Sequence, residues 1–146
     1  AVPEKNDEYQ YRESGLDNLV LVGMSPVRGS DIRIPKVNML HKLIGEAVVT
    51  KPSRLNGKEI RFLRTHIGYT VSDVAGYMGL SETTVKSCEN GSGFPDRQAE
   101  FVFRGHVLRE IDRVDLLDTS WRNVPADPAH IYRIDASNPD HYTLLA

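Results

Sequence analysis

The side chains that could do chemistry gather in one short segment, residues 81–91. If this segment is a helix, Val85 and Cys88 lie on its buried side. Its outer side then carries groups that donate or accept hydrogen bonds: Glu82, Thr83, Lys86, Ser87 and Asn90. A short helix with such a polar face, preceded by a turn and another helix, is typical of a unit whose second helix enters the major groove of DNA.

Three predicted helical segments over residues 56–91 position this polar face. Gly68 and Gly79 separate them, because glycine adopts the left-handed conformation that ends a helix at little cost. Each segment starts with a residue whose side chain can bind free backbone N–H groups, and Glu59 and Asp73 complete the first two as capping boxes. The three caps are Asn56, Thr70 and Ser81. The predicted inward residues are Ile60, Leu63, Ile67, Val74, Ala75 and Met78.

Residues 1–53 predict a small α+β accessory module. The apolar patterns of residues 18–23 and 31–34, with turn residues between them, favour an antiparallel hairpin over about 18–34. Two extended loops without stable pairing are the alternative. Residues 37–49 carry apolar side chains at helical spacing, and we expect this helix to pack on the hairpin, because a lone hairpin is marginal in water. Residues 50–54 follow as a linker or an ordered turn.

The central domain is expected to span residues 54–118 and to end with a helix from about Asp96 to Ile111. Residues 119–146 form a tail whose three prolines argue against long helices. In this tail, residues 131–134 and 142–145 are read as either short strands or loops. The fold class is therefore mostly α, with a small α+β module at the N-terminal side.

Charge and cysteine content limit the classes of function. The formal net charge is −2, with eight basic against six acidic residues over 54–109 and three against seven over 110–146. This asymmetry favours a modest DNA-binding face over a strong electrostatic binder. Cys88 is the only cysteine, which excludes an intrachain disulfide and a cysteine-based zinc site and favours a small buried residue over a redox sensor. A cytoplasmic location is expected, since no apolar run approaches the roughly 20 residues that span a bilayer.

Residues 55–111 resemble the Cro/XRE class of phage-repressor DNA-binding domains. The likeness rests on Ile60, Leu63-Arg64, Gly68, Thr70, Ala75, Gly79-Leu80-Ser81, Thr84-Val85, Glu89-Asn90-Gly91 and Pro95. Residues 11–68 also resemble antitoxins of the MqsA type, through residues 13–18, Ile34-Pro35, Leu40-His41 and residues 55–61. The zinc-ribbon cysteines of that family are absent, so no zinc or other metal is expected. The resemblance implies a lambda-repressor-like helix-turn-helix domain.

The resemblance also implies roles for individual side chains. The residues expected to read base edges are Glu82, Thr83 and Ser87, and the alternative is that they belong to an ordinary solvated helix face. The residues expected to contact phosphates are Thr70, Ser81, Lys86, Asn90 and Ser92. Arg64 is expected to form a structural ion pair with Glu89. Val71 stands where the family commonly has Gln, which removes one hydrogen bond to phosphate.

Together these features predict a sequence-specific DNA-binding transcriptional regulator, an autorepressor of antitoxin type that binds a double-stranded operator as a homodimer. The predicted dimer surface consists of Phe101, Val102, Leu108 and Ile111. The alternative is a protein-interaction module that neutralises a toxin or another partner through residues 1–50 or the acidic tail and binds DNA only weakly. Neither an enzyme activity, a cofactor nor a membrane partner is expected, because the histidines are scattered and no phosphate-binding glycine loop is present.

Overall fold

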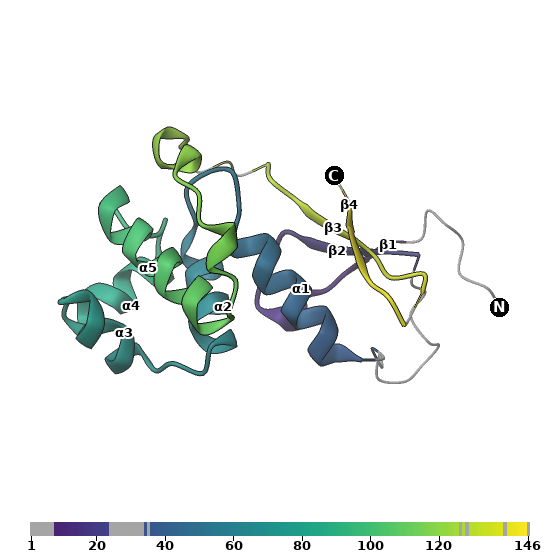
Figure 1. The fold of residues 1–146 in the computed structure, drawn as a ribbon, viewed down its shortest axis with the longest axis horizontal. Helices are drawn as coiled ribbons and strands as arrows, with labels where there is room; N and C mark the ends of the chain where they lie inside the picture. Colours follow the sequence, from purple (N-terminus) through teal and green to yellow (C-terminus); the bar gives the residue numbers. More distant parts are fainter. Residues whose placement is uncertain are drawn as a thin grey trace. The chain divides into compact units, whose positions relative to one another are not determined.

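The chain is mostly α-helical with one small mixed sheet (Figure 1). The computed structural model describes residues 8–23, 34, 36–125, 127, 129–138 and 140–145. Contacts divide the chain into two compact units, one of residues 1–47 with 129–146 and one of residues 48–128. These boundaries differ from the predicted ones at residues 53 and 118. Within the described ranges, no helix has the length and apolar character needed to cross a membrane.

The first unit contains a sheet in the order β1–β2–β3–β4. β1 (Glu8–Gln10) runs antiparallel to β2 (Leu19–Val22), and the 3-10 helix η1 (Arg12–Ser14) lies between them in the chain. β2 pairs in parallel with β3 (Tyr132–Asp135), which pairs antiparallel with β4 (Thr143–Leu145). The two central strands hold the core, where Leu21 lies opposite Ile134 and both side chains are fully buried. The sheet therefore joins segments from both ends of the described chain (Figure 1).

The sheet corrects the predicted hairpin over residues 18–34. β2 has β1 on one edge and β3 on the other, so neither edge remains for a partner strand at residues 31–34. Residues 24–33 themselves lie outside the described part of the chain. The apolar pattern identified the strand but could not identify its partners. One partner is distant in the chain. The Asn18 side-chain amide, for example, donates to the His130 backbone carbonyl, 112 positions away.

The strands predicted near residues 131–134 and 142–145 are present as β3 and β4. The predicted helix over residues 37–49 is also confirmed, as α1 (Val37–Val49). Leu40 and Ile44 on its apolar face are fully buried. Tyr11, the residue after β1, meets α1 through a 2.8 Å hydrogen bond between its hydroxyl and His41 Nε2. Burial lowers the pKa of His41 below its ordinary value, which favours the neutral ring at this contact.

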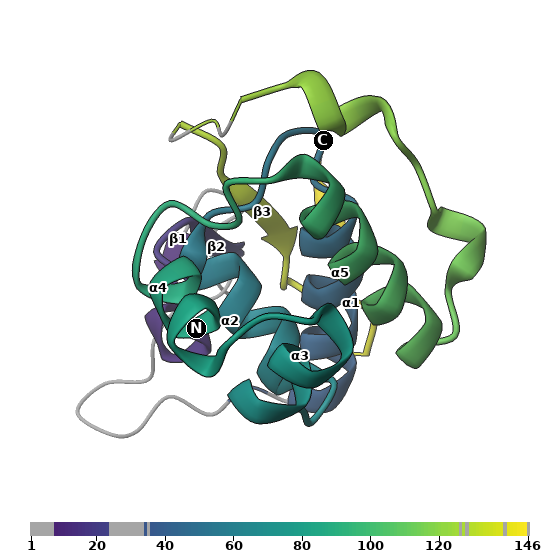
Figure 2. The same ribbon diagram turned by 90° about the vertical axis from the view of Figure 1, so that its left-hand side faces the viewer.

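In its described residues, the second unit contains four α-helices and two 3-10 helices besides the end of α1. They are α2 (Gly57–His66), α3 (Val71–Met78), α4 (Glu82–Asn90), α5 (Arg97–Glu110), η2 (Val114–Leu116) and η3 (Ser120–Asn123). The predicted capping boxes at Asn56 and Thr70 are both complete, and Ser81 and Asp96 cap the next two helices. The shared core includes Ile60, Leu63, Val74, Val85, Phe94, Phe103 and Val107. Figure 2 looks onto α3 and α4, which lie beside each other at one end of this unit.

Candidate nucleic-acid interface

α3 and α4 are joined by a tight turn over residues 79–81. Gly79 ends α3 with φ of 68°, a left-handed conformation that costs glycine little. The Leu80 N–H donates back to the Ala75 carbonyl at 3.0 Å, which closes the end of α3. The Ser81 hydroxyl then accepts from the Thr84 N–H at 3.1 Å and so begins α4. Local hydrogen bonds thus fix both helix ends at the turn.

The outer face of α4 carries the predicted base-reading residues side by side. Glu82, Thr83 and Ser87 are exposed, and so are Lys86 and Asn90 on the same helix. Val85, Cys88 and Glu89 form the buried face. Burial raises the pKa of the Cys88 thiol above its ordinary value, in keeping with a small core residue. Of the predicted phosphate-binding residues, Ser81, Lys86 and Asn90 belong to this helix or its cap, and the exposed Ser92 follows it directly.

Thr70 lies apart from this group, at the start of α3. Its backbone N–H donates to the Asp73 carboxylate at 2.8 Å, and its hydroxyl accepts from the Asp73 N–H. Hydrogen bonds from the Thr70 backbone N–H and from the Thr70 side chain lower the pKa of Asp73 below its ordinary value, so this carboxylate is ionised at neutral pH. A negative charge therefore already occupies the helix start where a DNA phosphate was expected.

Two basic residues beside α4 were not assigned a role from the sequence. Lys58 and Arg61 are exposed on α2. The Arg61 Nε atom lies 3.6 Å from Glu89 Oε1, near the end of α4, although the Arg61 side chain is 62% exposed. Their exposure could have been predicted from the sequence. Ile60 and Leu63 mark the buried face of α2, and this spacing leaves both basic side chains on the outer face. Arg61 places positive charge next to the part of α4 that carries Asn90.

The predicted ion pair between Arg64 and Glu89 is present and holds α4 in place. Arg64 Nε donates to Glu89 Oε2 at 2.6 Å and Arg64 Nη2 donates to Oε1 at 3.1 Å, a two-pronged pair. Arg64 Nη1 also donates to the carbonyl of Tyr69 at 2.8 Å. Both partners are largely buried, with side chains 12% and 3% exposed. One guanidinium thus connects α2, the loop before α3, and the end of α4.

The backbone at the start of α2 packs directly against the backbone at the end of α4. A Cβ atom on Gly57 would lie 2.3 Å from the Glu89 carbonyl oxygen and 2.6 Å from those of Cys88 and Gly91. The carboxyl end of one helix therefore meets the amino end of another, an arrangement that their dipoles favour. Only glycine allows this approach.

Replacing Gly57 by alanine is expected to destabilise the chain by about 1–3 kcal/mol, because backbone atoms must shift to admit the methyl group. Gly76→Ala is the matched control: Gly76 lies exposed within α3 with nothing near its added Cβ. It is expected to stabilise by up to about 1 kcal/mol through helix propensity. Urea unfolding of both variants measures the difference. Equal responses would show that the close approach of α2 and α4 is not tightly held.

Buried charges fix the segment that leads into α2. Arg104, 1% exposed, donates to the carbonyls of Val49 at 3.2 Å and Lys51 at 2.8 Å, and to Glu100 Oε2 at 2.8 Å. Glu100 also accepts from Arg54 Nε at 2.7 Å and from the Leu55 N–H at 3.1 Å.

A second buried pair joins Lys51 to Glu59 at 2.8 Å, with both side chains at most 1% exposed. Residues 50–54 are thus an ordered turn held by charges, one of the two alternatives left by the sequence.

The predicted dimer surface on α5 needs one correction. Leu108 is 2% exposed and belongs to the core of its own chain, so it is not available to a second copy. The buried face of α5 consists of Glu100, Phe103, Arg104, Val107 and Leu108. Phe101 and Ile111 are partly exposed and Val102 is 43% exposed, so these three remain on the surface.

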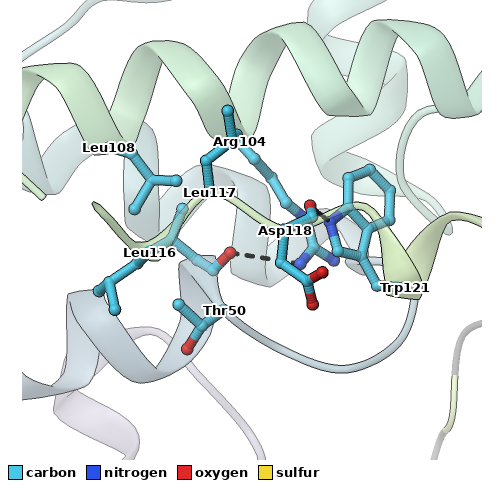
Figure 3. A pocket seen from close by; sticks show the side chains of 8 residues that line it. Thr50, Arg104, Leu108, Leu116, Leu117, Asp118 and Trp121 are labelled. Atoms are coloured by element: carbon cyan, nitrogen blue, oxygen red, sulfur yellow. Dashed lines mark hydrogen bonds between the residues drawn. The ribbon is translucent and has the colours of Figure 1, made fainter. Parts of the chain in front are cut away.

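A cavity of about 220 Å³ lies beside α5, lined in part by Arg104, Leu116 and Trp121 (Figure 3). The Arg104 guanidinium covers the Trp121 ring at 3.9 Å. The polar groups at this cavity are already engaged, since Trp121 Nε1 donates to the Asp118 carbonyl at 2.7 Å. We therefore regard the cavity as a consequence of the buried-charge packing. In the described ranges, no three histidine, cysteine or acidic side chains come together as a metal site.

Comparison of the chain with protein-family models, with curated proteins and with solved structures found no significant match.

Proposed function

We propose that residues 54–118 form a lambda-repressor-like helix-turn-helix domain, and that the chain is a DNA-binding transcriptional regulator with α4 as its recognition helix. The observation that carries the proposal is the polar outer face of α4 behind a tightly closed turn. The exposed hydrogen-bonding side chains of this one helix include Glu82, Thr83, Lys86, Ser87 and Asn90. A helix about 10–12 Å across fits the major groove of B-DNA, where base edges differ in their donors and acceptors.

Charge placement adds support. Lys86 lies on α4 and Arg61 approaches its C-terminal end, and both can neutralise backbone phosphates. Because Asp73 and Glu82 lie at the starts of α3 and α4, this surface is only mildly basic. We therefore expect modest affinity that depends on salt, with specificity shared between base edges and DNA shape.

Two copies are needed for a useful site, because one such unit reads only a few base pairs. A two-fold dimer would read half-sites about 34 Å apart. Phe101 and Val102 on α5, together with Ile111 at its C-cap, are the surface that we assign to the second copy. Repression of its own promoter follows from occlusion of that promoter by the bound dimer.

The second candidate is a module that binds a protein partner such as a cognate toxin. The carboxylates of Asp73 and Glu82 favour it. They lie at helix starts, where they offset the positive end of the helix dipole that would otherwise attract a DNA phosphate. A gel-shift experiment with DNA from upstream of the protein's own gene separates the two candidates. Absence of any salt-sensitive, sequence-specific complex would overturn the regulator proposal.

Two substitutions on α4 distinguish base reading from phosphate binding. Thr83→Ala is expected to alter base preference, at a cost of about 1–3 kcal/mol for the preferred site. Lys86→Ala is expected to weaken all sequences alike and to reduce the slope of log affinity against log salt by about 1. Fluorescence anisotropy with operator and scrambled duplexes over a salt series measures both quantities. If Thr83→Ala lowers affinity for both duplexes equally, α4 does not read bases through that residue.

A further inference from the structure

A polar surface pocket with an unbalanced charge lies in the second unit. Its volume is about 370 Å³, and its lining residues are Arg97, Thr119, Arg122 and Asn123. Arg97 is the first residue of α5, whereas the other three come from η3 and the residue before it. Two guanidinium groups from separate segments of the chain therefore share one hollow.

Among the residues that the structure describes, no carboxylate pairs with either arginine of this pocket. Arg97 Nη1 donates to the Asn123 side-chain oxygen, and Arg122 Nη2 donates to Gln98 Oε1 at 2.7 Å. Most other described arginines differ in this respect. Those paired with an acidic side chain are Arg54, Arg61, Arg64, Arg104, Arg113 and Arg133. The two positive charges at the pocket are thus oriented by neutral amides and are not cancelled by a paired carboxylate.

Neighbouring groups hold the pocket's donors in position. The Arg122 guanidinium lies 5.3 Å from the centre of the Phe101 ring, a cation–π contact that restricts its movement. Asn123 accepts from Arg97 through its oxygen, so its side-chain NH₂ group is left to donate. Thr119 contributes a hydroxyl to the lining. Each guanidinium has five N–H donors, and one amide contact leaves most of them for a ligand.

The acidic residues next to the pocket are turned to other partners. Asp96 caps α5 by accepting from the Gln98 N–H at 2.9 Å. Asp118 accepts from the Ser120 hydroxyl at 2.5 Å and from the Thr119 N–H at 2.8 Å. The hydrogen bond from Ser120 lowers the pKa of Asp118, so Asp118 is a fixed negative charge nearby. A ligand must therefore bind through direct forked hydrogen bonds rather than through net charge alone.

We propose that this pocket binds a phosphate group. Guanidinium forks match the paired oxygens of a tetrahedral phosphate, and the hydroxyl and amide donors can satisfy its remaining oxygens. The site goes beyond the DNA-reading face of α4, because none of its residues belongs to α3 or α4. The phosphate comes either from the backbone of bound DNA or from a small phosphorylated effector.

Isothermal titration of the full chain with inorganic phosphate at constant ionic strength tests the site directly. Saturable binding is expected, with acetate as a probe that does not compete. Arg97→Gln combined with Arg122→Gln is expected to weaken phosphate binding at least about tenfold, which corresponds to about 1.4 kcal/mol. Thr119→Val, which retains both charges, is a second variant and is expected to weaken binding by a smaller factor.

Arg12→Gln combined with Arg109→Gln is the matched control, since it removes the same charge from exposed positions outside the pocket. Arg12 is also held by an amide oxygen, that of Gln10, at 2.9 Å. Phosphate affinity of this control is expected to equal that of the wild type. Circular dichroism and thermal unfolding verify that each variant is folded. No saturable phosphate binding to the wild type, or equal losses in the pocket variant and the control, would overturn the proposal.

Duplex DNA then identifies the source of the phosphate. If the pocket contacts DNA, the Arg97/Arg122 variant reduces the slope of log affinity against log salt by about 1–2, and inorganic phosphate competes with the duplex. If the slope is unchanged while phosphate binding is lost, the ligand is a small phosphorylated compound. The phosphate titration needs no DNA, so its result is independent of whether α4 reads an operator.

Discussion

Replacement of Glu100 by glutamine is expected to lower the free energy of unfolding by about 3–5 kcal/mol. Glu100 is fully buried and neutralises Arg104, which is 1% exposed. Arg104 is almost fully buried, so removal of the carboxylate charge leaves a buried cation without its paired anion. Glutamine has nearly the same shape and can still accept from the Leu55 N–H. The loss therefore reports on the charge and not on a cavity.

Asp112→Asn is the control for this variant. It removes one negative charge from an exposed residue whose φ of 58° asparagine tolerates well. Its unfolding free energy is expected to stay within about 0.5 kcal/mol of the wild type. Guanidinium-induced unfolding followed by circular dichroism measures both. A loss below about 1 kcal/mol for Glu100→Gln would mean that Arg104 is not confined as described, because breaking a buried pair costs several times more.

The second large effect is expected at Glu89, whose replacement by glutamine should cost about 3 kcal/mol. The fork from Arg64 loses its anion, while Arg64 stays largely buried between α2 and α4. The expected cost is at the lower end of the range because the Arg64 side chain is 12% exposed and water can reach part of it. Chemical denaturation gives the magnitude.

Glu82→Gln, on the exposed face of the same helix, is the control for Glu89→Gln. It is expected to cost less than about 1 kcal/mol, the size of a helix-dipole contribution. Arg64→Lys should give an intermediate loss, because lysine retains the charge but not the two-pronged geometry. If Arg64→Lys is as stable as the wild type, the pair acts through simple charge attraction and the fork is irrelevant.

Local signals in the sequence predicted the helices of the second unit well. Asn56, Thr70 and Ser81 were identified as caps because a side chain that binds backbone N–H groups two or three residues ahead needs no information from elsewhere in the chain. Gly79 and α1 were also predicted from local signals, namely the conformational freedom of glycine and the helical spacing of apolar residues. The Arg64–Glu89 pair is distant in sequence, and its prediction rested on a family resemblance.

The composition of α5 explains why its surface was misassigned. Its buried face contains Glu100 and Arg104 beside Phe103, Val107 and Leu108. Two buried charges interrupt the apolar stripe, so hydrophobic periodicity could not identify which side faces the core. Charged residues are rarely fully buried unless they are paired, and their partners here include carbonyls of residues 49–53, which no periodic pattern reveals. Leu108 was placed on the surface as a result.

The pairing of the strands could not be predicted from the sequence for a different reason. Short strands were one of the two alternatives for the tail, and nothing in residues 131–134 indicates that their partner is β2. Parallel pairing requires a long crossover, and the partner can lie anywhere beyond it. The phosphate pocket could not be predicted for the same reason. Arg97 and Arg122 are distant in the sequence and meet only after α5 and η3 are placed together.

The parallel pairing of β2 with β3 makes the whole second unit an insertion within the first. Residues 48–128 leave the ribosome before β3 does, so they can fold while β2 still lacks its second neighbour. Closure of a flexible loop costs entropy that grows with the logarithm of its length. A folded insertion shortens the flexible part of that loop, so any substitution that unfolds residues 48–128 also raises the cost of completing the sheet. Chain connectivity alone therefore couples the stabilities of the two units.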